Sequence, residues 1–179
     1  QRRDGLAADL RHVDAAVEAL APHLDAPCLV VGKSTVPVGT AQRLAARLAR
    51  TAPAGAAVEL AWNPEFLREG HAIADTLTPD RLVFGVESGH AESVLLQVYA
   101  SVLDGGTPLV VTDLPTAELV KVSANAFLAT KISFINAIAE ICEMTGADVV
   151  KLADAIGYDP RIGRSFLDAG LGFGGGCLP

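Results

Sequence analysis

One cysteine of this 179-residue chain lies where a thiol could react. Cys177 follows a glycine-rich run that begins at Gly170, so its thiol is close to backbone N–H groups that few side chains shield. A thiolate in such a loop could act as a nucleophile toward an anionic or sugar ligand. A frayed chain end without a ligand is the alternative interpretation of the same glycines.

Two further pairs of polar residues have helical spacing. Glu65 and Glu69 would share one face of a helical turn, where two like charges raise the pKa of one carboxyl and favour acid–base catalysis. Lys121 and Asn125 have the same spacing on a segment that is otherwise apolar at most positions. A solvated helix start would also explain the glutamates, and a lysine at the helix edge could extend into solvent. The residues alone leave both pairs open.

A third polar group follows an apolar segment. Residues 27–31 have the character of a buried parallel strand, and Lys33, Ser34 and Thr35 come directly after it. Open α/β sheets bind ligands at this end of their strands, although serine and threonine are also ordinary turn residues. The histidines and cysteines lack metal-ligand spacing, so we expect no metal site. Cys28 and Cys142 fall inside apolar elements and are expected to be inert core thiols.

The elements that must position these groups alternate over the first 113 residues. Apolar periodicity predicts a helix over 4–21, and short apolar segments predict strands at 27–31, 58–62, 81–86 and 109–112. Thr40 and Ser88 are expected to cap helices that follow the first and third strands. Strands that alternate with helices predict a parallel α/β sheet covered by helices.

The pattern changes at Pro115. From there to about Met144 we expect one long helix that is apolar on nearly every face, with Phe127 and Ile135 among its residues. Such a helix must be covered by a second domain, a partner subunit or both, and we expect a homodimer through 115–144. The charged residues Lys121, Lys131 and Glu140 interrupt it, so we expect no membrane span. A short helix at 147–156 and the glycine-rich loop follow.

Composition narrows the class of protein. Half of the residues are apolar and 20% are charged, which excludes a disordered chain and a coiled coil. With 14 basic and 21 acidic residues and no basic run, nucleic acid and anionic membrane are not expected as partners. A small anionic ligand remains compatible. The odd number of three cysteines favours a reduced, cytoplasmic protein.

Taken in order, these motifs resemble the UDP-glucose/GDP-mannose dehydrogenase family. The matching segments are KSTVPVGT (33–40), NPEFLREGHAIADTLTPDRLVFG (63–85), AELVKVSANAFLATKISFINAIAEIC (117–142) and DPRIGRSFLDAGLGFGGGCLP (159–179). The GKSTVPVGT and TPDR forms are closer to the UDP-glucose branch than to the GDP-mannose branch. The resemblance implies a two-step, NAD-dependent oxidation of a UDP-sugar, from UDP-glucose to UDP-glucuronate. A GDP-mannose 6-dehydrogenase is the alternative within the class. A non-catalytic module that joins copies through the long helix is the alternative of another class.

The resemblance also implies roles for individual residues. Cys177 would hold the substrate as a thiohemiacetal and then a thioester, Glu65 would activate the hydrolytic water, and Lys121 with Asn125 would stabilise the oxyanion. Ser34, Thr35 and Glu69 would contact the cofactor, and Thr35 would also orient a water. Arg161 would reach the substrate of a neighbouring subunit. The full set of implied substrate contacts is Glu65, Phe66, Leu67, Arg68, Glu69, Lys121, Asn125, Arg161, Phe166, Leu167, Asp168, Ala169, Gly170, Phe173 and Gly174.

The expected fold class is α/β, in two parts. Residues 1–113 would be the C-terminal half of a Rossmann-like parallel-sheet domain that binds NAD. Residues 114–179 would be an α-helical central domain with one long helix, the dimer contact and the cysteine loop. The family's glycine-rich dinucleotide loop and its second Rossmann-like domain do not occur in this sequence. We therefore expect an internal fragment that is inactive on its own.

Overall fold

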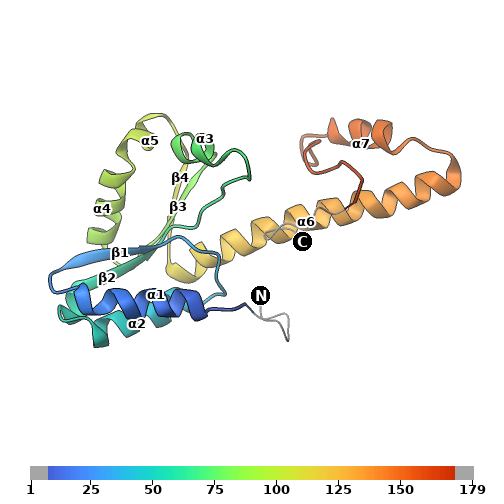
Figure 1. Ribbon diagram of the computed structural model, residues 1–179. Coiled ribbons are helices and arrows are strands. Elements are labelled where there is room, and N and C mark those ends of the chain that lie inside the picture. The colour runs from blue at the N-terminus through green and yellow to red at the C-terminus, as the bar shows by residue number, and fades with distance from the viewer. Residues whose placement is uncertain (1–7, 172–179) are drawn as a thin grey trace. The chain divides into compact units, whose positions relative to one another are not determined.

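The computed structural model of the chain describes residues 8–171. They form two compact units that divide between Val122 and Ser123, inside helix α6 (Leu114–Thr145). Figure 1 follows the chain from α1 through the strands to α6 and α7. The mixed α/β class with one long helix is confirmed.

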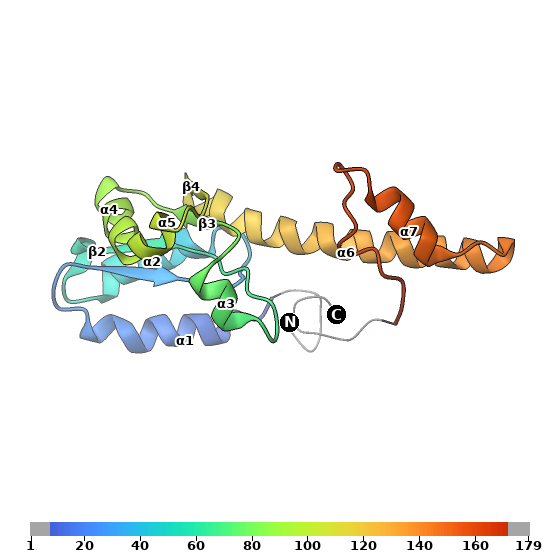
Figure 2. The same cartoon turned by 90° about the horizontal axis from the view of Figure 1, so that it is seen from above.

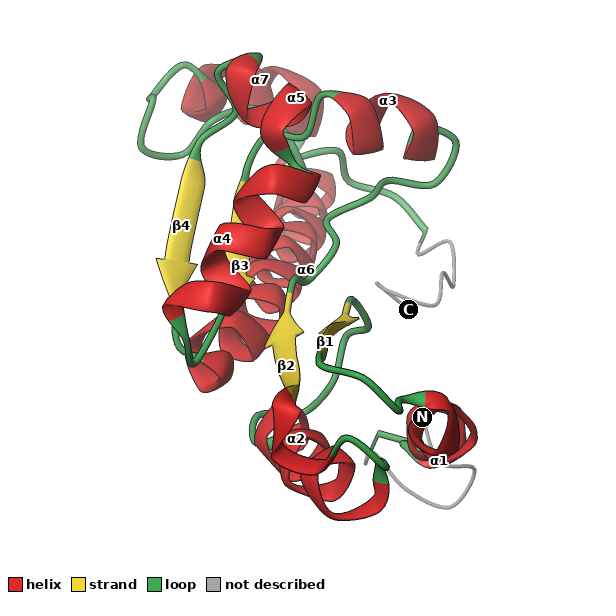
Figure 3. Ribbon diagram, turned by 90° about the vertical axis from the view of Figure 1, so that its left-hand side faces the viewer, coloured by secondary structure: helices red, strands yellow, loops and turns green. Residues whose placement is uncertain are grey.

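The first unit is built on a four-stranded sheet in the order β1-β2-β3-β4 (Figure 3). Its strands are β1 (Cys28–Gly32), β2 (Val58–Trp62), β3 (Leu82–Gly85) and β4 (Leu109–Thr112), each within a residue of its predicted limits. Strands β1 and β2 pair in parallel, with Cys28 opposite Val58, and β3 and β4 pair in parallel, with Leu82 opposite Leu109.

The prediction of a wholly parallel sheet is wrong at one place. Strands β2 and β3 run antiparallel and meet only at Trp62 and Gly85, and the arrows of β2 and β4 point in opposite directions in Figure 3. Parallel neighbours need a long crossover, which α2 (Thr40–Thr51) supplies between β1 and β2. Between β2 and β3 the chain forms only the six-residue α3 (Ala72–Leu77), so it returns in the opposite direction.

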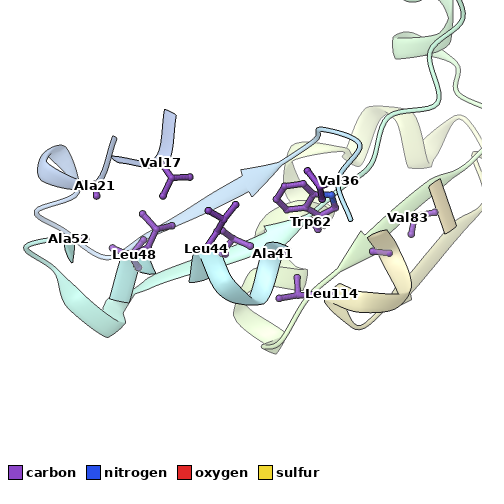
Figure 4. Close-up of a cluster of buried hydrophobic side chains, with 13 residues drawn as sticks. Val17, Ala21, Val36, Ala41, Leu44, Leu48, Ala52, Trp62, Val83 and Leu114 are labelled. Atoms are coloured by element: carbon purple, nitrogen blue, oxygen red, sulfur yellow. The ribbon is translucent and has the colours of Figure 1, made fainter. Parts of the chain in front are cut away.

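Helices cover both faces of this sheet. On one face, α1 (Arg11–Leu20), α2 and the first turns of α6 enclose the buried cluster drawn in Figure 4, where Trp62 lies beside Val36. On the other face lie α4 (Gly89–Val98) and α5 (Ala100–Asp104) (Figure 2). Their side chains pack against Leu82 and Phe84. Short 3-10 turns lie at Ala21–His23 and Gly55–Ala57. Helix α1 begins at Arg11, later than the predicted residue 4, and residues 1–7 lie outside the described part of the chain.

The two predicted helix caps have different outcomes. Ser88 does cap α4, because its hydroxyl accepts a hydrogen bond from the Ala91 N–H at 3.0 Å. Thr40 does not cap α2, because its hydroxyl donates instead to the Pro37 carbonyl at 2.6 Å. The N-cap of α2 is Gly39, whose φ of 91° matches the third position of a type II turn and favours glycine.

The second unit packs the later turns of α6 against α7 (Val149–Gly157) and the loop that follows it. Its core contains Ile135, Ala153 and Leu167. Asp148 caps α7 by accepting hydrogen bonds from the N–H groups of Val150 and Lys151. Ile135 is fully buried inside this unit, so its side chain is covered by the chain itself and is not available to a partner subunit.

Helix α6 is long and apolar enough to cross a membrane by length and composition, with a mean hydropathy of 1.3 over its most apolar stretch. Its few charged residues therefore do not exclude a span by composition, and the absence of a membrane span stays a prediction. Only 6% of that stretch is buried within the described structure. The large exposed apolar side chains of α6 are those of Leu119, Val122, Phe127, Phe134, Ile141 and Met144.

The packing of Trp62 on Gly32 generates a stability prediction. A Cβ added to Gly32 would lie 2.0 Å from the Trp62 ring, so Gly32→Ala should destabilise the first unit by about 1–3 kcal/mol through overpacking. Urea unfolding measures this, with fluorescence of the single tryptophan as the signal. Gly89→Ala is the matched control, because a Cβ there meets no atom within 4 Å. Equal midpoints for the two variants would contradict the packing argument.

Candidate active site

A buried amide links three strands of the sheet. Asn63 directly follows β2 and is fully buried, and its Nδ2 donates to the Val83 carbonyl at 3.0 Å. Its Oδ1 accepts two hydrogen bonds, from Lys33 Nζ at 2.7 Å and from the Tyr99 hydroxyl at 2.6 Å. Its backbone N–H donates to the Gly32 carbonyl at 2.8 Å. The amide therefore fixes the start of the Pro64–Gly70 loop to the strand ends, and Lys33 with it.

The loop after Asn63 is not the helical turn that we considered. Residues 63–68 have no helical structure, in line with the bias of a residue before proline against the helical region. Glu65 Oε2 instead accepts a hydrogen bond from the Leu67 N–H at 2.7 Å. Glu69 is exposed, and the two glutamates do not share a helix face.

Arg68 closes this loop on α3. Its backbone N–H and its guanidinium both bond to the carboxylate of Asp75, at 2.8 Å and 2.5 Å. These hydrogen bonds lower the pKa of Asp75 to about 2, because they favour the charged carboxylate. Leu67 is exposed, as is the guanidinium of Arg68.

The ammonium of Lys121 is buried beside this loop. Lys121 is only 5% exposed, and its Nζ lies 3.6 Å from Glu65 Oε1 and 5.3 Å from the centre of the Phe66 ring. The guanidinium of Arg81 lies 3.9 Å from the same ring centre. The structure thus answers the question left open by the sequence, because this lysine is buried and paired rather than extended into solvent.

Two hollows flank these residues within the first unit. One of about 130 Å³ is lined by Lys33, Asn63, Glu65, Phe66 and Tyr99, together with residues 79–82. A larger groove of about 350 Å³ runs between α1 and β1 and is mostly apolar, with Lys33 and Ser34 among its lining residues. Ser34 and Thr35 are both exposed on the loop that leads to α2.

Sequence reasoning missed one buried acid. Glu118 is 1% exposed, and its carboxylate accepts hydrogen bonds from backbone N–H groups at the start of α2. A signal was present, because Glu118 is a charged residue in the same apolar segment that drew attention to Lys121. Tyr99, Asn63 and Arg81 were also not singled out, since only the folded chain brings them to the loop.

The remaining predicted residues lie in the second unit. Asn125 is half-buried, one turn after Lys121 on α6. The guanidinium of Arg161 bonds to Asp159 at 2.6 Å and lowers the pKa of that carboxyl. Phe166 is exposed and has a φ of 65°, a strained value for a residue with a side chain. Leu167 is buried in the core, so its side chain anchors the loop.

The loop 166–170 is also held by hydrogen bonds. Arg164 bonds to Asp154 at 2.6 Å and to Asp168 at 2.7 Å, and both contacts raise the pKa of Arg164. The Gly170 N–H donates to Asn136 Oδ1 at 2.9 Å. Ala169 packs against the same core as Leu167. Phe173, Gly174 and Cys177 lie outside the described residues.

Two family models match the chain. Residues 1–103 match the NAD binding domain of the UDP-glucose/GDP-mannose dehydrogenase family, and residues 115–179 match the central domain of the same family. The chain belongs to this family.

Relatives within the family agree in sequence and in fold. A UDP-glucose 6-dehydrogenase of Rickettsia bellii is 48% identical over 172 residues, which are 96% of this chain and 39% of the relative. A UDP-glucose dehydrogenase structure from Pyrobaculum islandicum matches with a TM-score of 0.90 and 46% identity, covering 96% of this chain and 40% of the other. A GDP-mannose dehydrogenase structure from Pseudomonas aeruginosa has a TM-score of 0.83 and 27% identity, covering all of this chain and 42% of the other. The chain thus spans about two fifths of the length of these relatives.

Proposed function

We propose that the protein containing this chain oxidises UDP-glucose to UDP-glucuronate, with two molecules of NAD+ consumed for each substrate. The observation that carries the proposal is the Lys121 ammonium, buried 3.6 Å from the Glu65 carboxylate in a chain of this family. The relatives named as UDP-glucose 6-dehydrogenases support UDP-glucose as the substrate.

The two charges suit the chemistry of an alcohol and its aldehyde. A buried ammonium stabilises an oxyanion more strongly than an exposed one, because little solvent screens it. The carboxylate of Glu65 can accept a proton from a water molecule and so activate it for hydrolysis. The role of Asn125 as a hydrogen-bond donor to the same oxyanion rests on the family resemblance.

Residues 33–35 fit a nucleotide cofactor. They follow the carboxyl end of β1, a parallel strand, where open α/β sheets hold nucleotides. Ser34 and Thr35 are exposed there, so their hydroxyls are free to contact a ligand, and Glu69 is exposed on the neighbouring loop. When bound, NAD+ accepts the hydride in each of the two oxidations.

Cys177 completes the proposal through the family resemblance. After the first oxidation, its thiolate adds to the aldehyde carbon and gives the oxyanion of a thiohemiacetal, which keeps the aldehyde bound. Removal of a hydride from that carbon leaves a thioester. A water activated by Glu65 then breaks the C–S bond, which releases the carboxylate product and restores the thiolate. The substrate contacts proposed for the loop 166–174 and for Arg161 also rest on the resemblance.

The proposed reaction can be tested with the full-length protein. With UDP-glucose it should form two NADH per substrate, and Lys121→Met should lower kcat about 100- to 1,000-fold, the cost of losing an oxyanion partner. Absorbance of NADH measures both. Lys151→Met is the control, because that lysine is 85% exposed on α7. Wild-type kcat in Lys121→Met would contradict the proposed role, and faster turnover of GDP-mannose would contradict the substrate.

We also propose that a second copy covers the exposed face of α6 in a cytoplasmic homodimer. The helix carries Lys131, whose ammonium donates to the carbonyls of Ile162 and Gly163 at 3.0 Å, and an exposed Glu140. A charge that faces lipid is costly. In a contact between two protein copies, the same charge can stay at the solvent-exposed edge of the interface. Phe127, at 65% exposure, is the large aromatic side chain we expect at the contact.

The exposure of Phe127 makes the proposed interface testable. Phe127→Asp in the full-length protein should give monomers in sedimentation, because the charge would be buried without a partner in the dimer. Tyr158→Asp is the control, since Tyr158 is an exposed aromatic residue outside α6. A dimer that survives Phe127→Asp would count against this interface, and recovery of the wild type with membranes would count against cytoplasmic dimers.

A further inference from the structure

Glu118 joins α6 to the start of α2. Its Oε2 accepts the Gly39 N–H at 2.6 Å and its Oε1 accepts the Ala41 N–H at 2.6 Å. Gly39 is the N-cap of α2 and Ala41 lies in its first turn, where backbone N–H groups have no partner inside the helix. Both oxygens thus meet donors only, which is the arrangement that an ionised carboxylate needs.

The charge of Glu118 is balanced by α2. A carboxylate that is 1% exposed would be costly without partners. Two charge-assisted hydrogen bonds and the positive end of a twelve-residue helix offset that cost. Within residues 8–171, no ion pair to a lysine, arginine or histidine involves Glu118. Its position therefore depends on α2, and the position of α2 depends on it.

This contact fixes one end of the segment 33–40. Gly39 lies in the turn that runs from Pro37 to Thr40, directly before α2. At the other end of the segment, Trp62 Nε1 donates to the Ser34 carbonyl at 3.2 Å. Between the two anchors, Val36 is buried in the core and Thr35 is exposed. The exposed hydroxyls at 34 and 35 are thus carried on a segment held from both ends.

The same acid is one helical turn from Lys121. Residues three apart on a helix are neighbours on its surface, so the Glu118 anchor and the buried ammonium share the first turns of α6. We propose that Glu118 is a positioning residue, which sets the segment 33–35 against Lys121. This inference rests on the proposed function, in which that segment contacts NAD+ and Lys121 contacts the reacting oxygen. Hydride transfer requires that the cofactor and the reacting group of the substrate are held in a defined relative position.

Glu118→Gln in the full-length protein tests the inference. The amide keeps the size of the side chain but turns an N–H donor toward one backbone N–H, so one anchor is lost. We expect kcat to fall about 10- to 100-fold, the range for a displaced reacting geometry, with a raised KM for NAD+. KM for UDP-glucose should not change, because the residues proposed to bind it do not bond to Glu118. Glu92→Gln is the matched control, since Glu92 lies in the first turn of its own helix, α4.

The readouts separate positioning from mere stability. A lower urea midpoint with wild-type kcat and wild-type KM for NAD+ would overturn the inference. If Glu118→Gln does not fold, Glu118→Asp replaces it, because the shorter acid keeps the charge and reaches fewer donors. The same split between kcat and the two KM values is then expected, and wild-type kinetics would overturn the inference.

Failure of the proposed function has a different signature. It would appear as no NADH from UDP-glucose with the wild type. Amide hydrogen exchange then tests the anchor by itself. Faster exchange at Gly39 and Ala41 in Glu118→Gln would support the anchor, and unchanged exchange would overturn it.

Discussion

Helix α6 buries two side chains of opposite charge in its first turns, and each takes its partner from a different loop of the α/β unit. Glu118 is balanced by the N–H groups that begin α2, and Lys121 by the carboxylate of Glu65. A buried charge without its partner is strongly unfavourable, so both loops must hold their places for the helix to pack. The sheet and the segments that connect its strands therefore hold the partners of both buried charges of α6.

The two loops keep their places because the sheet fixes the residues from which they begin. Trp62 packs on Gly32, and Asn63 ties the ends of β1 and β2 to β3 through the Val83 carbonyl. Because the side chain of Asn63 is fully buried, the direction in which the chain leaves β2 is fixed at Pro64. Glu65 then follows at a defined place beside Lys121. Contacts at the strand ends thus place Glu65 beside Lys121, which lies more than fifty positions later in the sequence.

The sequence was sufficient for the strands, the long helix and the family, because apolar segments and motifs are local signals. It did not reveal that β3 reverses direction, since this depends on a short connection and a single residue pair at Trp62 and Gly85. It left Lys121 undecided, because burial of a lysine depends on a loop more than fifty positions away. It missed Glu118, because the hydrogen-bond partners of this residue are backbone N–H groups. Every residue except proline has such a group, so the sequence does not indicate which ones bind a carboxylate. Cys177 stays a prediction, since it lies outside the described residues.

A double-mutant cycle on Glu65 and Lys121 tests the central claim most directly. The quantity is kcat/KM for UDP-glucose in the full-length wild type, Glu65→Gln, Lys121→Met and the double variant. If the two charges act as one unit, each single variant loses most of the activity and the double variant loses little more. The coupling free energy would then be close to the loss in either single variant, about 2–3 kcal/mol, at the upper end of the range for residues in contact. Losses that simply multiply would contradict the account, because they would show that each charge works independently of the other.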